Sequence, residues 1–283
     1  MKQVKKLLSI FTVSAIVAAA FAGCAGGESG NQTSGSQQSA LSGTVVLGGS
    51  TSVAEVIGAL SEAFMEVNSD VDVTYEPSGS GAGITGAKEG TLDIGLSSRS
   101  LKEDETGVSE TVFALDGIAV IVNNENPIKN LTLEQIKGLA TGEITNWKEV
   151  GGADASVVFV GREAGSGTRD GFESIVDVKD SCKYEQEHNS TGAVIAAVAA
   201  NPNAFGYASL AALEDTVKDV TVDGIVCSEQ TVQDGSYKIQ RPFVFVTNDS
   251  NAPGAAAQEF IKFATSPEVE QLIVDAGAVP TTK

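Results

Sequence analysis

The sequence predicts an α/β protein whose strands form mostly parallel sheets covered by helices on both faces. Short apolar runs typical of strands alternate with segments whose apolar residues recur at helical spacing. Three strands are each followed by a turn of Gly and Ser residues and then by a helix, at 48–52, 78–83 and 161–170. Such alternation is typical of parallel strands joined by helices.

The first 24 residues have the pattern of an export signal. Three lysines precede an apolar stretch, 7–22, that is too short for a stable membrane span. The sequence Ala-Gly-Cys at 22–24 resembles a bacterial lipobox, in which the cysteine becomes the lipidated first residue of the mature chain. Phe21 stands where an aliphatic residue is usual, and a plain export signal with an incidental Cys24 is the alternative.

Composition sets limits on the remaining chain. Residues 25–42 are almost entirely small or polar and cannot bury a core, so we expect a flexible tether. About 240 residues follow, enough for one large or two ordinary domains. The formal net charge of −19 excludes nucleic acid as a partner, because nucleic-acid-binding surfaces are basic. A buried anion site is still allowed, because distant charges are screened over ~8 Å.

The first part of the folded chain is expected to contain three strands and two helices. Apolar residues recur between Val53 and Val67 at helical spacing, which makes one buried stripe. The expected elements are a strand at 44–47, a helix over that stripe, a strand at 71–75, a short helix at 84–89 and a strand at 92–96. Residues 81–86 match Gly-x-Gly-x-x-Gly, but the long helix and the acidic residue of a dinucleotide site are missing, so we expect no cofactor.

The second part continues the alternation. An apolar run at 113–122 is interrupted by Asp116. The expected elements after it are a helix at 131–139, a loop at 146–147, a strand at 157–160, a helix after the turn at 161–170, a helix at 191–200, strands at 205–207, near 220 and at 243–246, and two closing helices. Asn189, Ser190 and Thr191 precede one of these helices. We expect them to cap it, since Asn and Ser are preferred caps, and the alternative is a further donor to the ligand cleft.

The turn at 161–170 has the composition of an oxyanion cradle. A glycine-rich turn between a strand and a helix exposes backbone N–H groups that have no partner within the helix. Ser166 and Thr168 add hydroxyl donors, and Arg162 adds a planar, permanent charge, with Arg169 as a second possible cation. A tight turn with a serine cap would have a similar sequence. The repetition of the turn on two other strands favours the cradle.

Six motifs occur in a characteristic order. They are Gly49-Ser50-Thr51, Tyr75-x-x-x-Gly79-Ser80-Gly81, Asp93-Ile94-Gly95-Leu96-Ser97-Ser98-Arg99, Asp116-Gly117-Ile118-Ala119, Ile144-Thr145-Asn146-Trp147 and Gly165-Ser166-Gly167-Thr168. Together they resemble the phosphate-binding lipoproteins of bacterial high-affinity ABC phosphate importers, and the resemblance covers nearly everything from Gly43 onward.

The resemblance implies the two-lobed periplasmic-binding-protein fold of type II. Each lobe is then a mostly parallel sheet flanked by helices, and the chain crosses between the lobes twice. Mapped onto this sequence, the crossings fall near Val122 and Val246. Lobe one is expected to comprise 43–122 plus 247–283, and lobe two 123–246.

The resemblance also implies a function without a chemical reaction. The protein is expected to bind inorganic phosphate outside the cytoplasm and to deliver it to the transmembrane permease subunits of an ABC importer. A lipid on Cys24 would anchor it to the cell membrane. We expect a monomer that needs no cofactor or metal.

Most ligand contacts of the family transfer directly to this chain. They fall on Ser50 or Thr51, Ser80, Arg162, Ser166, Gly167 and Thr168. One position departs from the pattern, because many members carry an aspartate that accepts the proton of hydrogen phosphate where this sequence has Ser98. Asp116 is the candidate substitute. The alternative is a structural carboxylate paired with Arg99 or Arg162.

Other functions lack support in the sequence. A hydrolase with Ser166 or Ser80 as nucleophile needs a base, and the single histidine, His188, lies in a polar stretch predicted to be a solvated loop. A function as a receptor for sulfate, molybdate or phosphonate, or as an adhesin or sensor, is still compatible with the sequence, because fold does not dictate ligand.

Cys182 and Cys227 either form a disulfide or remain separate, and the sequence allows both.

Overall fold

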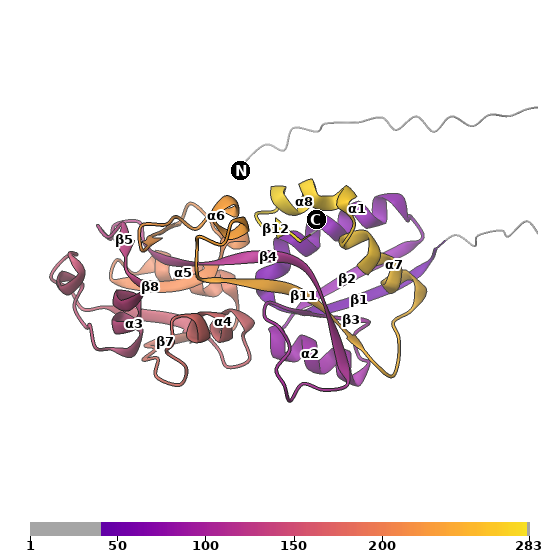
Figure 1. Cartoon of the computed structure of the whole chain (residues 1–283), viewed down its shortest axis with the longest axis horizontal. Coiled ribbons are helices and arrows are strands. Elements are labelled where there is room, and N and C mark those ends of the chain that lie inside the picture. Colours follow the sequence, from indigo (N-terminus) through magenta and orange to yellow (C-terminus); the bar gives the residue numbers. More distant parts are fainter. Residues whose placement is uncertain (1–40, 282–283) are drawn as a thin grey trace, which may run out of the picture. The chain divides into compact units, whose positions relative to one another are not determined.

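A computed structural model of the chain describes residues 41–281 (Figure 1). The predicted export signal, the lipidation site at Cys24 and nearly all of the predicted tether lie outside the described residues. Within the described range, none of the helices has both the length and the apolar character needed to cross a membrane.

Strands and helices alternate along most of the described chain. The strands are β1 (Gly43–Gly49), β2 (Val71–Pro77), β3 (Ile94–Ser97), β4 (Val108–Asn123), β5 (Asn130–Leu131), β6 (Val158–Arg162), β7 (Gln186–His188), β8 (Ala204–Ser209), β9 (Val217–Asp219), β10 (Thr221–Val222), β11 (Gln240–Asn248) and β12 (Val279–Pro280). The α-helices are α1 (Ala54–Val67), α2 (Ser80–Glu89), α3 (Leu133–Thr141), α4 (Gly167–Ile175), α5 (Thr191–Ala200), α6 (Glu229–Gln233), α7 (Ala255–Ala264) and α8 (Glu270–Asp275). Short 3-10 helices are η1 (Thr51–Val53), η2 (Trp147–Val150), η3 (Leu210–Ala212) and η4 (Pro267–Val269).

One hydrogen-bonded sheet connects the two ends of the fold, in the order β2-β1-β3-β11-β4-β8-β6-β7. At one end β1 is parallel to β2 and β3, and at the other β6 is parallel to β7 and β8. The antiparallel pairings of this sheet all involve β4 or β11. The predicted parallel sheets are therefore present in each half, and two long antiparallel strands join them (Figure 1).

Two hydrophobic cores define two lobes. Lobe one surrounds the core of β1, β3, α1 and α7, and lobe two surrounds the core of β6, β8, α3 and α5. Strand β4 contributes residues up to Ala114 to the first core and residues from Ile118 onward to the second. At the start of β11 the change lies between Ile239, which directly precedes the strand and packs in lobe two, and Phe243, which packs in lobe one.

The change of core lies before both predicted crossings. The sequence placed the crossings near Val122 and Val246, whereas the buried side chains change core at 115–117 on β4 and at 240–242 on β11. The physical reason is that both strands stay apolar well past the change, because each continues as a core strand. Assigned by core, we place the lobe boundaries at these earlier positions.

The lobe-one sheet is covered on both faces, as the sequence predicts. Phe243 and Phe245 of β11 face the core of α1 and α7, while Val244 and Val246 pack with Ile84 of α2 on the opposite face. Successive strand residues point to opposite sides of a sheet, which explains this division. The sheet is thereby buried between two helical layers.

Several elements differ from their predicted form. Helix α2 begins at Ser80 and not at residue 84. The sequence analysis missed this first turn because it consists of small residues that show no apolar periodicity. The predicted loop around His188 contains β7, whose backbone pairs with β6 although its side chains are polar. Ser190 caps α5 as expected, since its side chain accepts from Ala193 N at 3.2 Å. Cys182 and Cys227 are both free thiols.

The central glycine of the 81–86 motif, Gly83, allows close packing of α2 on the sheet. A Cβ on Gly83 would lie 2.7 Å from Leu96 O and 2.8 Å from Gly48 O. Both distances are too short for a real contact and involve backbone atoms, which cannot turn away. The motif that resembles a dinucleotide fingerprint is therefore explained by contact between a helix and two strands.

Replacing Gly83 by alanine is expected to destabilise lobe one. The added methyl group forces α2 away from β1 and β3, and overpacking of this kind costs about 1–3 kcal/mol. The control is Gly58→Ala in α1, where a Cβ meets nothing within 4 Å and helix propensity improves. Urea unfolding followed by circular dichroism measures both, and equal midpoints for the two variants would contradict the packing role of Gly83.

Candidate anion-binding site

The three Gly/Ser turns meet between the lobes. Ser50 precedes η1 and Ser80 begins α2, both in lobe one, while Ser166 caps α4 of lobe two by accepting from Arg169 N at 3.3 Å. The two lobes touch through backbone at this point, since Gly81 N donates to Gly165 O at 3.0 Å. The convergence expected from the repeated turns is thus present in the structure.

Three predicted serines form a buried hydroxyl cluster in lobe one. Ser50 Oγ donates to Ser98 Oγ at 2.8 Å, and the hydroxyls of Ser80 and Ser98 lie 3.2 Å apart. Ser98 N also donates to Ser80 Oγ at 3.1 Å. All three side chains are buried. A hydroxyl both donates and accepts, so the cluster offers an anion adaptable donors at a dry position.

Hydroxyls from both lobes meet in a second cluster. Ser52 Oγ lies 2.7 Å from Thr168 Oγ1 and 3.0 Å from Thr191 Oγ1. Thr51 Oγ1 lies 3.1 Å from Thr191 Oγ1 and accepts from Thr191 N. The sequence prediction included Thr51 and Thr168, considered Thr191 as a helix cap or as a donor to the cleft, and missed Ser52. The run of hydroxyl residues at 50–52 was the available signal for Ser52.

Arg162, a predicted ligand contact, lies at the end of β6 beside the second hydroxyl cluster. It is 1% exposed, and its backbone N–H donates to Tyr207 Oη at 3.1 Å. The guanidinium donates through Nε and Nη2 to both oxygens of Glu163 at 2.8 and 2.9 Å, and through Nη1 to Thr191 Oγ1 at 3.1 Å. Glu163 therefore fixes the plane of the guanidinium and leaves its Nη1 edge directed toward the hydroxyl cluster.

A second buried arginine, Arg241, was missed by the sequence analysis. It comes from β11 and is 4% exposed. Its Nη1 donates to Ser98 O at 3.0 Å in lobe one and to Thr168 Oγ1 at 2.9 Å in lobe two. An arginine directly before a buried apolar strand was the only signal in the sequence, and its proximity to the turns depends on how β11 crosses between the lobes.

Asp116 holds Arg241 in place. Its Oδ2 accepts from Nε and Nη2 of Arg241 at 3.2 and 2.9 Å, and its Oδ1 accepts from Ser209 Oγ at 2.8 Å. Burial raises the pKa of Asp116, and the charge of Arg241 opposes part of that rise. The structural ion pair considered above is thus present, with Arg241 in the place of Arg99 or Arg162. The role of Asp116 as acceptor of a ligand proton stays a prediction.

The remaining cradle residues differ in orientation. Gly167 faces lobe one so closely that a Cβ would lie 2.5 Å from Ser80 Oγ and 2.7 Å from Ser98 Oγ. Arg169, considered a second cation of the cradle, instead donates through Nε to Glu173 at 2.8 Å and stacks over the ring of Tyr184 at 4.7 Å. Arg169 therefore contacts side chains of lobe two and is not directed at the anion site.

Within residues 41–281, Ser80 and Ser166, the serines considered as nucleophiles, bond to hydroxyl and backbone groups and not to His188. His188 Nε2 lies 3.3 Å from Gln186 Oε1, and the hydrogen-bond partners of Ser80 are other hydroxyl and backbone groups. Across residues 41–281, no group of three or more His, Cys, Asp or Glu side chains is placed to hold a metal ion.

Comparisons with known proteins identify the family of this chain. Residues 34–268 match the family model described as PBP superfamily domain. The chain is 30% identical over 247 residues to the phosphate-binding protein PstS of Borreliella burgdorferi, covering 82% of this chain and 88% of that protein, and 30% identical over 293 residues to PstS of Bacillus subtilis, covering 100% and 96%. It therefore belongs to the PstS family of phosphate-binding proteins within that superfamily.

Solved structures give the same assignment. The fold superposes with a TM-score of 0.82 and 40% identity on a phosphate ABC transporter substrate-binding protein from Clostridium perfringens, crystallised with bound phosphate, covering 85% of this chain and 100% of that one. An ABC-type phosphate transport receptor from Vibrio cholerae matches with a TM-score of 0.68 and 34% identity, covering 83% of this chain and 99% of the receptor.

Proposed function

We propose that this protein binds inorganic phosphate between its two lobes, outside the cytoplasm, and delivers it to the permease subunits of an ABC importer. The observation that carries the proposal is the meeting of Ser50, Ser80 and Ser98 of lobe one with Thr168 and the two buried arginines at one point. The similar protein from Clostridium perfringens, which holds phosphate in its crystal structure, supports the choice of anion.

The donor set suits a small tetrahedral anion. The hydroxyls are buried, and helices α2 and α4 begin at this point, so their first backbone N–H groups carry the positive end of the helix dipole. The guanidinium groups of Arg162 and Arg241 add charge-assisted hydrogen bonds, which are shorter and stronger than neutral ones. Donors from both lobes can share one ligand only when the lobes are closed.

Binding is then coupled to closure without any chemical step. A ligand shifts the lobes toward the closed form only by its higher affinity for that form. The hydroxyls of Ser52 and Thr168 from opposite lobes lie 2.7 Å apart, which supports a ligand position close to the contacts between the lobes. We infer that the permease recognises the closed form.

The proposed cellular setting rests on the sequence of the first 24 residues and on membership of the family. We infer that the first 24 residues direct export, that a lipid on Cys24 anchors the protein to the membrane, and that the chain acts as a monomer. The order of a basic start, an apolar stretch and a small-residue site before Cys24 supports the anchor.

Isothermal titration of residues 25–283 with phosphate and then sulfate tests the proposal. Unfolding and refolding first removes any ligand carried through purification. We expect one phosphate per chain and sulfate binding at least about tenfold weaker, because fully deprotonated sulfate cannot donate to the hydroxyl cluster and a lost buried hydrogen bond costs about 1–3 kcal/mol. Equal binding of both anions would indicate a general oxyanion receptor, and no heat with either would contradict the proposal.

Gly167→Ala is expected to weaken phosphate binding about 10- to 100-fold, because its methyl group would collide with Ser80 and Ser98 in the closed form. Gly192→Ala is the matched control, since it also lies at the start of a lobe-two helix but its Cβ meets nothing within 4 Å. Titration measures both affinities, and small-angle scattering with phosphate present measures closure. Identical affinities for the two variants would show that Gly167 does not limit closure.

Asp116→Asn separates two roles for this carboxylate. We propose that Asp116 acts through Arg241, which it orients toward Ser98 and Thr168. The variant should then weaken phosphate and sulfate by a similar factor. If Asp116 instead accepts the ligand proton, its replacement should weaken phosphate binding more than sulfate binding and so narrow the difference in affinity between the two anions. Thermal unfolding of the variant verifies that it is folded at the temperature of the titrations.

A further inference from the structure

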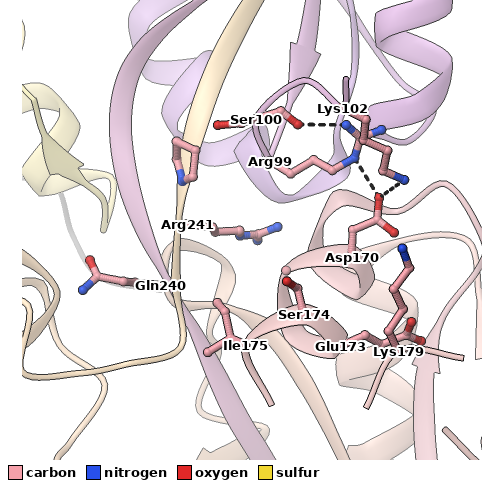
Figure 2. A pocket seen from close by; sticks show the side chains of 12 residues that line it. Arg99, Ser100, Lys102, Asp170, Glu173, Ser174, Ile175, Lys179, Gln240 and Arg241 are labelled. Atoms are coloured by element: carbon pink, nitrogen blue, oxygen red, sulfur yellow. Dashed lines mark hydrogen bonds and ion pairs between the residues drawn. The ribbon is translucent and has the colours of Figure 1, made fainter. Parts of the chain in front are cut away.

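A second set of contacts between the lobes lies beside the anion site. Arg99 Nε lies 2.7 Å from Asp170 Oδ2, and Lys102 Nζ lies 2.7 Å from the same oxygen (Figure 2). Arg99 and Lys102 belong to the loop after β3 in lobe one, and Asp170 belongs to the first turn of α4 in lobe two. The three side chains form an ion-pair cluster that exists only when the lobes approach each other.

Arg99 is held in position by its own lobe. Its Nη1 and Nη2 each donate to Glu105 at 2.7 Å, and Nη1 also donates to Ser100 O at 2.9 Å. Burial alone would lower the pKa of Arg99, but the paired carboxylates of Glu105 and Asp170 reverse this effect and raise it. The guanidinium is therefore charged and held by its own lobe, and its Nε lies 2.7 Å from Asp170 Oδ2 of α4, an ion-pair contact without the geometry of a hydrogen bond. A side chain fixed in advance loses little conformational entropy when the second partner arrives.

Both partners are tied directly to the anion site. Arg99 follows Ser98, whose hydroxyl belongs to the buried cluster, and Asp170 stands two residues after Thr168 on the same helical turn. A displacement of either partner therefore moves a proposed ligand contact of the same lobe. Neither Arg99 nor Asp170 bonds to the hydroxyl cluster itself, so their effect on the ligand is indirect.

We propose that Arg99 and Asp170 are positioning residues that set the closed register of the two lobes and slow the release of the bound anion. The inference rests on the proposed function. In this proposal the pair aligns Ser98 of lobe one with the first turn of α4 in lobe two. Lys102 pairs with the same Asp170 carboxylate from the solvent side.

The surroundings of the pair make its strength dependent on salt. Arg99, Lys102 and Asp170 line a cavity of about 300 Å³, which Gln240 also lines (Figure 2). The side chains of Lys102 and Asp170 are 50% and 26% exposed, so mobile ions can reach the pair. Partly exposed ion pairs weaken as salt shortens the Debye length from about 10 Å at 0.1 M to about 3 Å at 1 M.

The test is the rate of phosphate release from the full-length protein carrying Asp170→Asn. Radiolabelled phosphate is chased with an excess of unlabelled phosphate at 0.05 M and 1 M NaCl. We expect the variant to release phosphate about 5- to 50-fold faster than wild type at low salt, within the usual range of coupling between two sites. Wild type should release faster as salt rises, and the variant should show little dependence. Lys102→Met should give a smaller change in the same direction.

Asp177→Asn is the matched control. Asp177 pairs with Lys137 at 2.7 Å, but both residues lie in lobe two, so this pair does not depend on closure. Thermal unfolding of the unliganded proteins excludes a general loss of stability. If Asp170→Asn releases phosphate like Asp177→Asn at both salt concentrations, the positioning role is wrong while the proposed function stands. Failure of wild type to bind phosphate would overturn the proposed function and this role together.

Discussion

The fold depends on one buried ion pair between the two strands that join its lobes. Asp116 of β4 and Arg241 of β11 are cross-strand partners in the sheet, and both are almost completely buried where the strands pass from one core to the other. Removing one member of such a pair typically costs about 3–5 kcal/mol, because the other charge is left without compensation in a dry environment. An apolar pair of similar size would satisfy the strands equally well, so stability alone does not account for these residues. What an apolar pair would lose is the contact of Arg241 with Ser98 O in lobe one and with Thr168 in lobe two.

This arrangement explains how a chain with a net charge of −19 can hold an anion. Each arginine of the site is already neutralised by a carboxylate, Arg162 by Glu163 and Arg241 by Asp116. The local charge is therefore close to balanced, and the site must attract its ligand chiefly through oriented N–H and O–H dipoles. Such dipoles act over a few ångströms, so distant surface acidity affects them little, since mobile ions screen it within a Debye length of about 8 Å. The paired carboxylates also keep the guanidinium groups oriented before the ligand arrives, which reduces the entropic cost of binding.

Sequence alone could predict the features that depend on residues close together in the chain. A Gly/Ser turn between a strand and a helix specifies a helix start, which is why the sequence could predict that Ser166 and Gly167 lie where α4 begins. Arg241 could not be placed, because its position depends on the register between two strands that are far apart in the chain. The point where the strands change lobes was also hidden, since apolar residues continue on both sides of it. Arg169, by contrast, has Glu173 four residues later, and this spacing alone indicates an ion pair within the helix.

The contacts between the lobes must also be limited in strength. A receptor of this kind admits its ligand in the open form, so any interaction that closes the lobes without ligand lowers the fraction of protein able to bind. Direct hydroxyl contacts such as that between Ser52 and Thr168, together with the ion pair of Arg99 and Asp170, favour closure on their own. The partial exposure of the Asp170 side chain, which weakens the ion pair, and the entropy gained when the lobes separate oppose closure. The two lobes can then open in the absence of anion only if the contacts described here stay just weaker than the cost of closing. The hydrogen bonds of the ligand supply the remaining free energy of closure. The closed form is then populated mainly when the ligand is bound.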